Sequence, residues 1–145
     1  MIIKIYCDNG VTPKWLKKLK RKGQVELCYV PYENRASIPK QVEPSLVEYN
    51  QAGFTYNEPS VTYNSSPSDK YGSILQIVGG DKDFDVRHMD AAFKNKCVAF
   101  ITSDKRAFIN NKRREKLEKL LGIKIFHQQE ENKFLDNFKD ILIIK

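Results

Sequence analysis

The sequence predicts an α/β domain whose mainly parallel sheet has helices on both faces. Short apolar runs typical of buried strands alternate with segments of helical periodicity, and this order favours parallel strands joined through helices. A chain of 145 residues is close to the commonest size for one domain. Its hydrophobic content of 41% is enough for a core, and its 11% of aromatic residues argues against disorder. We therefore expect a single domain over residues 1–145, with an irregular insertion at about residues 32–80.

The chain is basic, and its cysteines are few. Lysine and arginine number 25 against 18 acidic residues, which gives a formal net charge of +7. No apolar stretch approaches the ~18 residues that a membrane span needs, and the first residues, Met1–Lys4, lack the pattern of a signal peptide. Cys7, Cys28 and Cys97 lie far apart within apolar runs, which favours reduced core thiols over a disulfide framework or a zinc site. The sequence therefore predicts a cytoplasmic protein without a membrane partner.

Two strands and one helix are expected before the insertion. Ile2–Tyr6 is a short apolar run, and Asp8–Gly10 has the composition of the turn that ends it. Thr12–Pro13 has the order of an N-cap followed by proline at the first helical position, so a helix is expected to begin there. Gly23 is suited to end that helix. A second buried strand is expected at Val25–Val30.

The pattern weakens in the insertion and becomes regular again after it. Tyr32–Gly80 is rich in proline, asparagine and serine, and allows only a short helix at Pro44–Asn50 and a strand or helix at Ser73–Val78. Asp85–Lys96 reads as a helix and Val98–Ile101 as a buried strand. The remaining elements are expected to be a helix at Lys112–Leu121 ended by Gly122, a strand at Ile123–Phe126, a helix at Glu130–Phe138 and a strand at Ile141–Ile144.

Three aspartates occupy comparable places in this order of elements. Asp8 follows the first strand, Asp104 follows the Val98–Ile101 strand, and Asp85 opens the helix that leads into that strand. Ligands of open parallel sheets bind beyond the carboxyl ends of the strands, where the connection order reverses. If the two strands are neighbours, the three carboxylates meet in one cleft, and a hard divalent cation would relieve their repulsion. Each aspartate is alternatively a helix cap or a turn residue.

Basic and polar residues adjoin these acids. Lys105 and Arg106 directly follow Asp104, so they are best placed to bind a phosphate of a polyanionic substrate. Asn9 and Ser103 are expected to hydrogen bond to waters around a metal ion. The other basic clusters, Lys17–Lys22 and Lys112–Arg114, are either phosphate contacts or solvated helix faces. Of the two histidines, His88 is expected to pack on the sheet, and His127 has no assigned role.

Two segments resemble the PIN-domain ribonucleases. Asp85–Ala92 has the family's form of an aspartate that opens a helix, and Val98–Phe108 contains a strand that ends in Thr-x-Asp and soon reaches a phenylalanine. Tyr6–Gly10 is similar to the opening aspartate of short PIN-like variants. The resemblance covers residues 1–33 and 80–127. It implies a three-layer α/β/α sandwich that cleaves single-stranded RNA with Mg²⁺ or Mn²⁺, and many such proteins are toxins paired with an antitoxin.

The resemblance also implies a set of metal ligands. Asp8, Asp85 and Asp104 match the family's metal-binding acids, and a fourth acid is expected between the first strand and the later helix. Glu33 is the first choice for that acid and Glu48 the second. The expected partners are single-stranded RNA, an antitoxin protein and a second copy of the chain in a homodimer. The alternatives are a degenerate PIN-like module that binds nucleic acid or protein without cutting, and an α/β signalling domain with a phosphoacceptor aspartate.

Overall fold

The fold is described from a computed structural model of the chain, over residues 2–8, 11–30, 67–79 and 83–142. Four of the expected features lie outside these residues: Asn9, Glu33, Glu48 and the short helix at Pro44–Asn50. No helix within the described ranges is long and apolar enough to cross a membrane.

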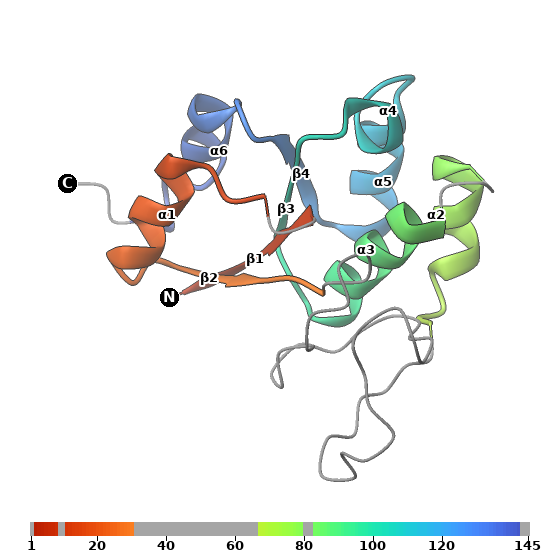
Figure 1. Ribbon diagram of the computed structural model, residues 1–145, viewed down its shortest axis with the longest axis horizontal. Helices are drawn as coiled ribbons and strands as arrows, with labels where there is room; N and C mark the ends of the chain where they lie inside the picture. The colour runs from red at the N-terminus through yellow and green to blue at the C-terminus, as the bar shows by residue number, and fades with distance from the viewer. Residues whose placement is uncertain (1, 9–10, 31–66, 80–82, 143–145) are drawn as a thin grey trace, which may run out of the picture.

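The centre of the molecule is a four-stranded sheet in which every neighbouring pair is parallel (Figure 1). The strand order is β2-β1-β3-β4, so β1 and β3 are central neighbours, and Cys7 of β1 lies opposite Ile101 of β3. From β1 the chain first forms β2 on one side, and after the insertion it forms β3 on the other side of β1. The direction of the connections therefore reverses between β1 and β3, and the carboxyl ends of these two strands form the switch point of the sheet. The strands are β1 (Ile3–Cys7), β2 (Val25–Cys28), β3 (Ala99–Thr102) and β4 (Lys124–His127).

Helices cover both faces of this sheet, which confirms the predicted α/β sandwich. Figure 1 shows α1 and α6 on one side and α2, α3 and α5 on the other. Two separate clusters of buried side chains fill the two interfaces. The helices are α1 (Lys14–Arg21), α2 (Tyr71–Val78), α3 (Asp83–Lys94), α4 (Lys105–Phe108), α5 (Arg113–Leu121) and α6 (Glu131–Asn137).

The alternation of side chains along the strands divides the core into these two clusters. Ile5 faces the α1 and α6 side, whereas its neighbour Tyr6 faces α2 and α3. The Tyr6 ring stacks on Phe100 of β3, with centroids 5.4 Å apart and planes inclined by 5°. Both rings are fully buried, and each such burial stabilises the fold by about 1.5–3 kcal/mol.

The start of α1 differs from the sequence prediction, whereas its end agrees with it. Pro13, not Thr12, is the N-cap residue of α1, and no side chain caps this end; the Thr12 side chain hydrogen bonds with the Cys7 thiol. The extended backbone of Pro13 (φ −66°, ψ 159°) suits an N-cap, because the cap residue precedes the helical dihedrals. Gly23 follows the end of α1 at φ 73°, as expected of a glycine that ends a helix.

The C-terminal half follows the predicted order with two changes, and Ser73–Val78 adopts the helix of its two predicted alternatives. The Ser73–Val78 segment is helical and belongs to α2, and a short helix, α4, follows Asp104. The prediction of a last strand is wrong for Ile141 and Leu142, which lie in a turn and a bend; residues 143–144 are outside the described ranges. The reason is packing, because Leu142 fills the core beside Phe138.

Candidate functional site

An open cavity of about 720 Å³ lies beyond the carboxyl ends of β1, β3 and β4. It brings together the two strand-end acids, Asp8 and Asp104, as expected if β1 and β3 are neighbours. Lys105 and Arg106 line the same cavity and are exposed to solvent. The other lining residues are Ser103 and the three residues at the end of β4, His127, Gln128 and Gln129.

Asp8 is held in place from the neighbouring strand. Its side chain is only 2% exposed, immediately after the last residue of β1. The Thr102 hydroxyl donates a hydrogen bond of 2.8 Å to Asp8 Oδ2 and accepts one of 2.9 Å from the Asp104 amide. One hydroxyl therefore fixes the position of the Asp8 carboxylate relative to the backbone of Asp104.

A buried histidine approaches Asp8 from α3. His88 is fully buried, and its Nε2 lies 3.9 Å from Asp8 Oδ1, so the contact is electrostatic rather than a hydrogen bond. On its other side, Nδ1 is 2.8 Å from the Tyr6 hydroxyl, which accepts a hydrogen bond of 3.1 Å from the Val30 amide. If this hydroxyl donates its own hydrogen to Nδ1, the neutral ring carries its proton on Nε2, facing Asp8. The expectation that His88 packs against the sheet is confirmed.

Asp104 has a capping role as well as a place in the cavity. It is the N-cap of α4, and its Oδ1 accepts a hydrogen bond of 3.1 Å from the Ala107 amide. Within the described ranges its other oxygen, Oδ2, accepts no hydrogen bond from the protein. The side chain is half-buried. Asp104 can therefore cap the helix with one oxygen and offer the second to a ligand.

Asp85 lies on α3, outside the described lining of this cavity. It is half-buried in the first turn of α3 and is not among the described residues that line the cavity. The helix α3 begins at Asp83, two residues earlier than predicted, so Asp85 is its third residue rather than its first. In the part of the chain that the structure describes, no three or more His, Cys, Asp or Glu side chains form a group that could hold a metal ion.

Two residues that follow β4, Gln128 and Gln129, were missed by sequence reasoning as parts of this cavity, and His127, at the end of β4, had been assigned no role. His127 Nδ1 accepts a hydrogen bond of 3.2 Å from the Gln129 amide, which leaves the ring proton of the neutral form on Nε2. The Gln128 carbonyl accepts a hydrogen bond of 2.9 Å from the Trp15 indole of α1. The signal that could have identified them is their position, since they follow a strand parallel to β1 and β3.

The chemistry of the cavity is mixed in charge. Two carboxylates at its base can bind a cation, whereas Lys105 and Arg106 beside them can bind an anion. Ser103 and the two glutamine side chains add neutral hydrogen-bonding groups. This combination of groups suits a phosphate ester bound together with a divalent cation.

Comparison of the chain with models of known families, with curated proteins and with solved structures finds no match.

Proposed function

We propose that this chain is a metal-dependent endoribonuclease of the PIN-like type, which cleaves phosphodiester bonds of single-stranded RNA. The observation that carries the proposal is the meeting of Asp8 and Asp104 with Lys105 and Arg106 in one cavity at the switch point of the sheet. The resemblance of Asp85–Ala92 and Val98–Phe108 to PIN-domain ribonucleases supports the same reaction.

The two acids of the cavity fit a magnesium or manganese ion. Mg²⁺ usually takes one or two carboxylates and keeps several waters, so Asp8 and Asp104 are sufficient as direct ligands. In this proposal Asp85 acts from α3 through water, and Glu33 is the fourth acid. When bound, the ion supplies positive charge that stabilises a phosphodiester oxyanion and lowers the pKa of a coordinated water.

The protein's own groups would bind and orient the substrate. Lys105 and Arg106 supply two positive charges beside the acids, and their contacts to phosphates do not depend on the base sequence. The Thr102 hydroxyl holds Asp8 in one orientation, so the carboxylate needs no rearrangement when substrate arrives. Ser103 and Asn9 would hydrogen bond to waters around the ion.

Cleavage of single-stranded RNA in Mg²⁺ or Mn²⁺ tests this function. We expect Asp8→Asn and Asp104→Asn each to lower the cleavage rate by about 10²-fold or more, because each removes a ligand charge at the reacting phosphate. The matched control is Asp136→Asn, since Asp136 is 80% exposed on α6 and pairs with Lys139 at the surface. Circular dichroism checks the fold of each variant. Full activity of both cavity variants would refute the proposal.

A second candidate function is RNA binding without cleavage. The composition of the cavity favours it, because only two acids, Asp8 and Asp104, are among the described residues that line it. Calorimetric titration with Mn²⁺ separates the two functions. Absence of Mn²⁺ binding, together with RNA binding that weakens steeply with salt, would select the binding module.

A further inference from the structure

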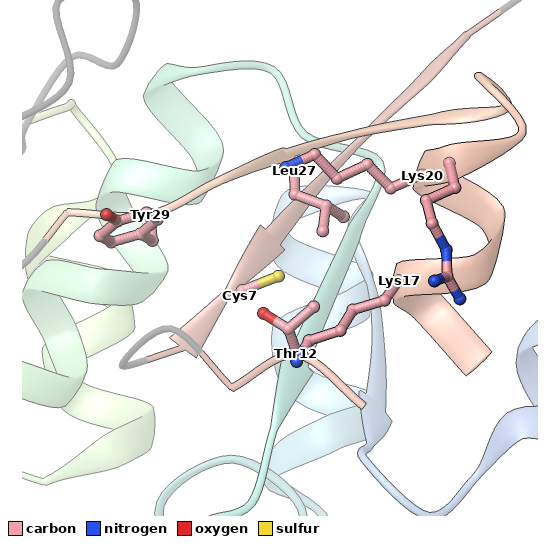
Figure 2. Close-up of a pocket in the computed structure, with 7 residues that line it drawn as sticks. Cys7, Thr12, Lys17, Lys20, Leu27 and Tyr29 are labelled. Atoms are coloured by element: carbon pink, nitrogen blue, oxygen red, sulfur yellow. The ribbon is translucent and has the colours of Figure 1, made fainter. Parts of the chain in front are cut away.

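A second cavity lies against the C-terminal half of α1, where Lys17, Lys20 and Arg21 border it. It has a volume of about 710 Å³ and is lined by residues of β1, α1 and β2, by Thr12 between β1 and α1, and by Tyr29, which directly follows β2 (Figure 2). No described residue lines both this cavity and the one that holds Asp104. The volume is within the range of about 300–1,000 Å³ typical of small-molecule sites. The lining residues are Cys7, Thr12, Lys17, Lys20, Arg21, Leu27 and Tyr29.

The floor of this second cavity is apolar. Cys7 is buried and Leu27 half-buried, and both belong to the core cluster beneath α1. Burial raises the pKa of the Cys7 thiol to about 12, so the sulfur is neutral at physiological pH. Tyr29 stands on the far side from α1 and is 40% exposed (Figure 2). The floor therefore suits the planar, weakly polar part of a ligand.

The rim of the cavity is positively charged. Lys17, Lys20 and Arg21 line it, and no acid is among the described lining residues. Figure 2 shows Lys17 and Lys20 extending from α1 toward Thr12 and Leu27, so two ammonium groups reach across the apolar floor. Within the described ranges neither lysine forms an ion pair. An anion bound between them would relieve the repulsion of like charges.

We propose that this cavity binds a small aromatic phosphate ester of the nucleoside monophosphate class. The phosphate lies between Lys17 and Lys20, with Arg21 beside it, and the planar base packs on Leu27 and Tyr29. Aromatic side chains accept any base by stacking, and cationic side chains bind phosphate through charge-assisted hydrogen bonds. This site needs neither the metal ion nor the cleavage reaction of the first cavity.

Isothermal titration of the full chain with adenosine 5′-monophosphate tests the site. We expect the Lys17→Gln/Lys20→Gln double variant and Tyr29→Leu each to raise the Kd about tenfold or more. The control is Lys18→Gln, which removes one positive charge from the same turn of α1 at a residue outside the described lining, and it should change the Kd less than twofold. Adenosine and inorganic phosphate should each bind at least about tenfold more weakly than the nucleotide.

Three outcomes would overturn the proposal. They are absence of nucleotide binding, an equal loss of binding in Lys18→Gln, and inorganic phosphate that binds as tightly as the nucleotide. Asp104→Asn separates this site from the proposed nuclease, because it should lower the RNA cleavage rate by about 10²-fold or more and leave the nucleotide Kd unchanged. Nucleotide binding lost in Asp104→Asn would mean that the ligand occupies the first cavity instead.

Discussion

Thr102 is the residue through which the two acids of the first cavity are linked. Its hydroxyl bonds to the Asp8 carboxylate and to the Asp104 amide, and the side chain is fully buried. A buried hydroxyl with two partners stabilises the fold more than one hydrogen bond does. Its loss leaves the Asp8 carboxylate without this donor and the Asp104 amide without this acceptor. The geometry of the proposed metal site therefore depends on a residue that would not itself bind the metal.

The first prediction concerns this hydroxyl. Thr102→Val keeps the shape of the side chain but removes both hydrogen bonds, so we expect the free energy of unfolding to fall by about 1–3 kcal/mol. Urea denaturation followed by circular dichroism measures the change. Thr102→Ser is the control, since it retains the hydroxyl and should lose less. Equal stability of the valine variant and the natural protein would contradict the role given to Thr102.

The second prediction concerns the Cys7 thiol. Its pKa is raised by burial to about 12, four pH units above pH 8, so about one thiol in ten thousand is ionised there. We expect iodoacetamide to label Cys7 only after denaturation, as mass spectrometry of digested protein would detect. The neutral thiol is favoured by folding, so its contribution to stability is present below pH 9.0 and is lost as the pH rises from 9.0 through about 12. Rapid labelling of the native protein at pH 8 would contradict this assignment.

At the scale of the elements, Glu130 joins the end of β4 to two helices. Its carboxylate accepts a hydrogen bond of 2.7 Å from the His127 amide, and it pairs with Arg114 of α5 at 3.2 Å and Lys133 of α6 at 2.9 Å. Burial opposes ionisation of Glu130, but the His127 amide and the two cations outweigh it and lower its pKa below 4.5. One side chain thus fixes the position of α6 against α5.

The third prediction follows from this lowered pKa. Glu130→Gln should reduce the free energy of unfolding by about 1 kcal/mol at pH 7, because the carboxylate is partly exposed and its ion pairs are screened. The contribution is present above pH 4.5 and is lost as the pH falls through the folded-state pKa, so the two proteins should converge in stability in acid. Denaturation at several pH values measures both effects. A difference that grows below pH 4.5 would refute the assignment.

The element boundaries show which signals the sequence carries. Apolar runs located the strands, because burial of a strand requires apolar side chains. Glycines located the ends of α1 and α5, because glycine readily adopts the left-handed backbone that ends a helix. The start of α3 was placed two residues late at Asp85, since Asp83 is an equally good first residue. The four-residue α4 is too short for any periodic pattern.

At the scale of the whole molecule, the parallel sheet and its two helical layers followed from the alternation of patterns along the chain. The order of the strands did not, because pairing of β1 with β3 is a contact between segments separated by the long insertion. Asp8 and Asp104 were predicted to meet only on the condition that these strands are neighbours, and they are. Gln128 and Gln129 were missed because their residue types do not distinguish them from surface residues, and only their position after a parallel strand does.

The fourth prediction uses the net charge of +7. Binding to single-stranded RNA should weaken with salt, with a slope of about −0.7 per phosphate contact on a double logarithmic plot. Lys105→Gln/Arg106→Gln should make the slope about 1.4 less steep, because two such contacts are lost. Lys116→Gln/Lys139→Gln, which removes the same charge from exposed positions outside the cavity, is the control. Equal slopes for the two double variants, measured by fluorescence anisotropy, would show that net charge alone attracts RNA.

The hydrogen bond from the Trp15 indole to the Gln128 carbonyl gives this molecule a built-in optical reporter. The chain has a single tryptophan, so all of its indole emission comes from one residue of α1. Gln128 borders one cavity, and Lys17, two residues beyond Trp15, borders the other. A ligand that displaces either the Gln128 carbonyl or α1 would alter the surroundings of the same fluorophore, so occupancy of both cavities can be followed in solution without attaching a dye.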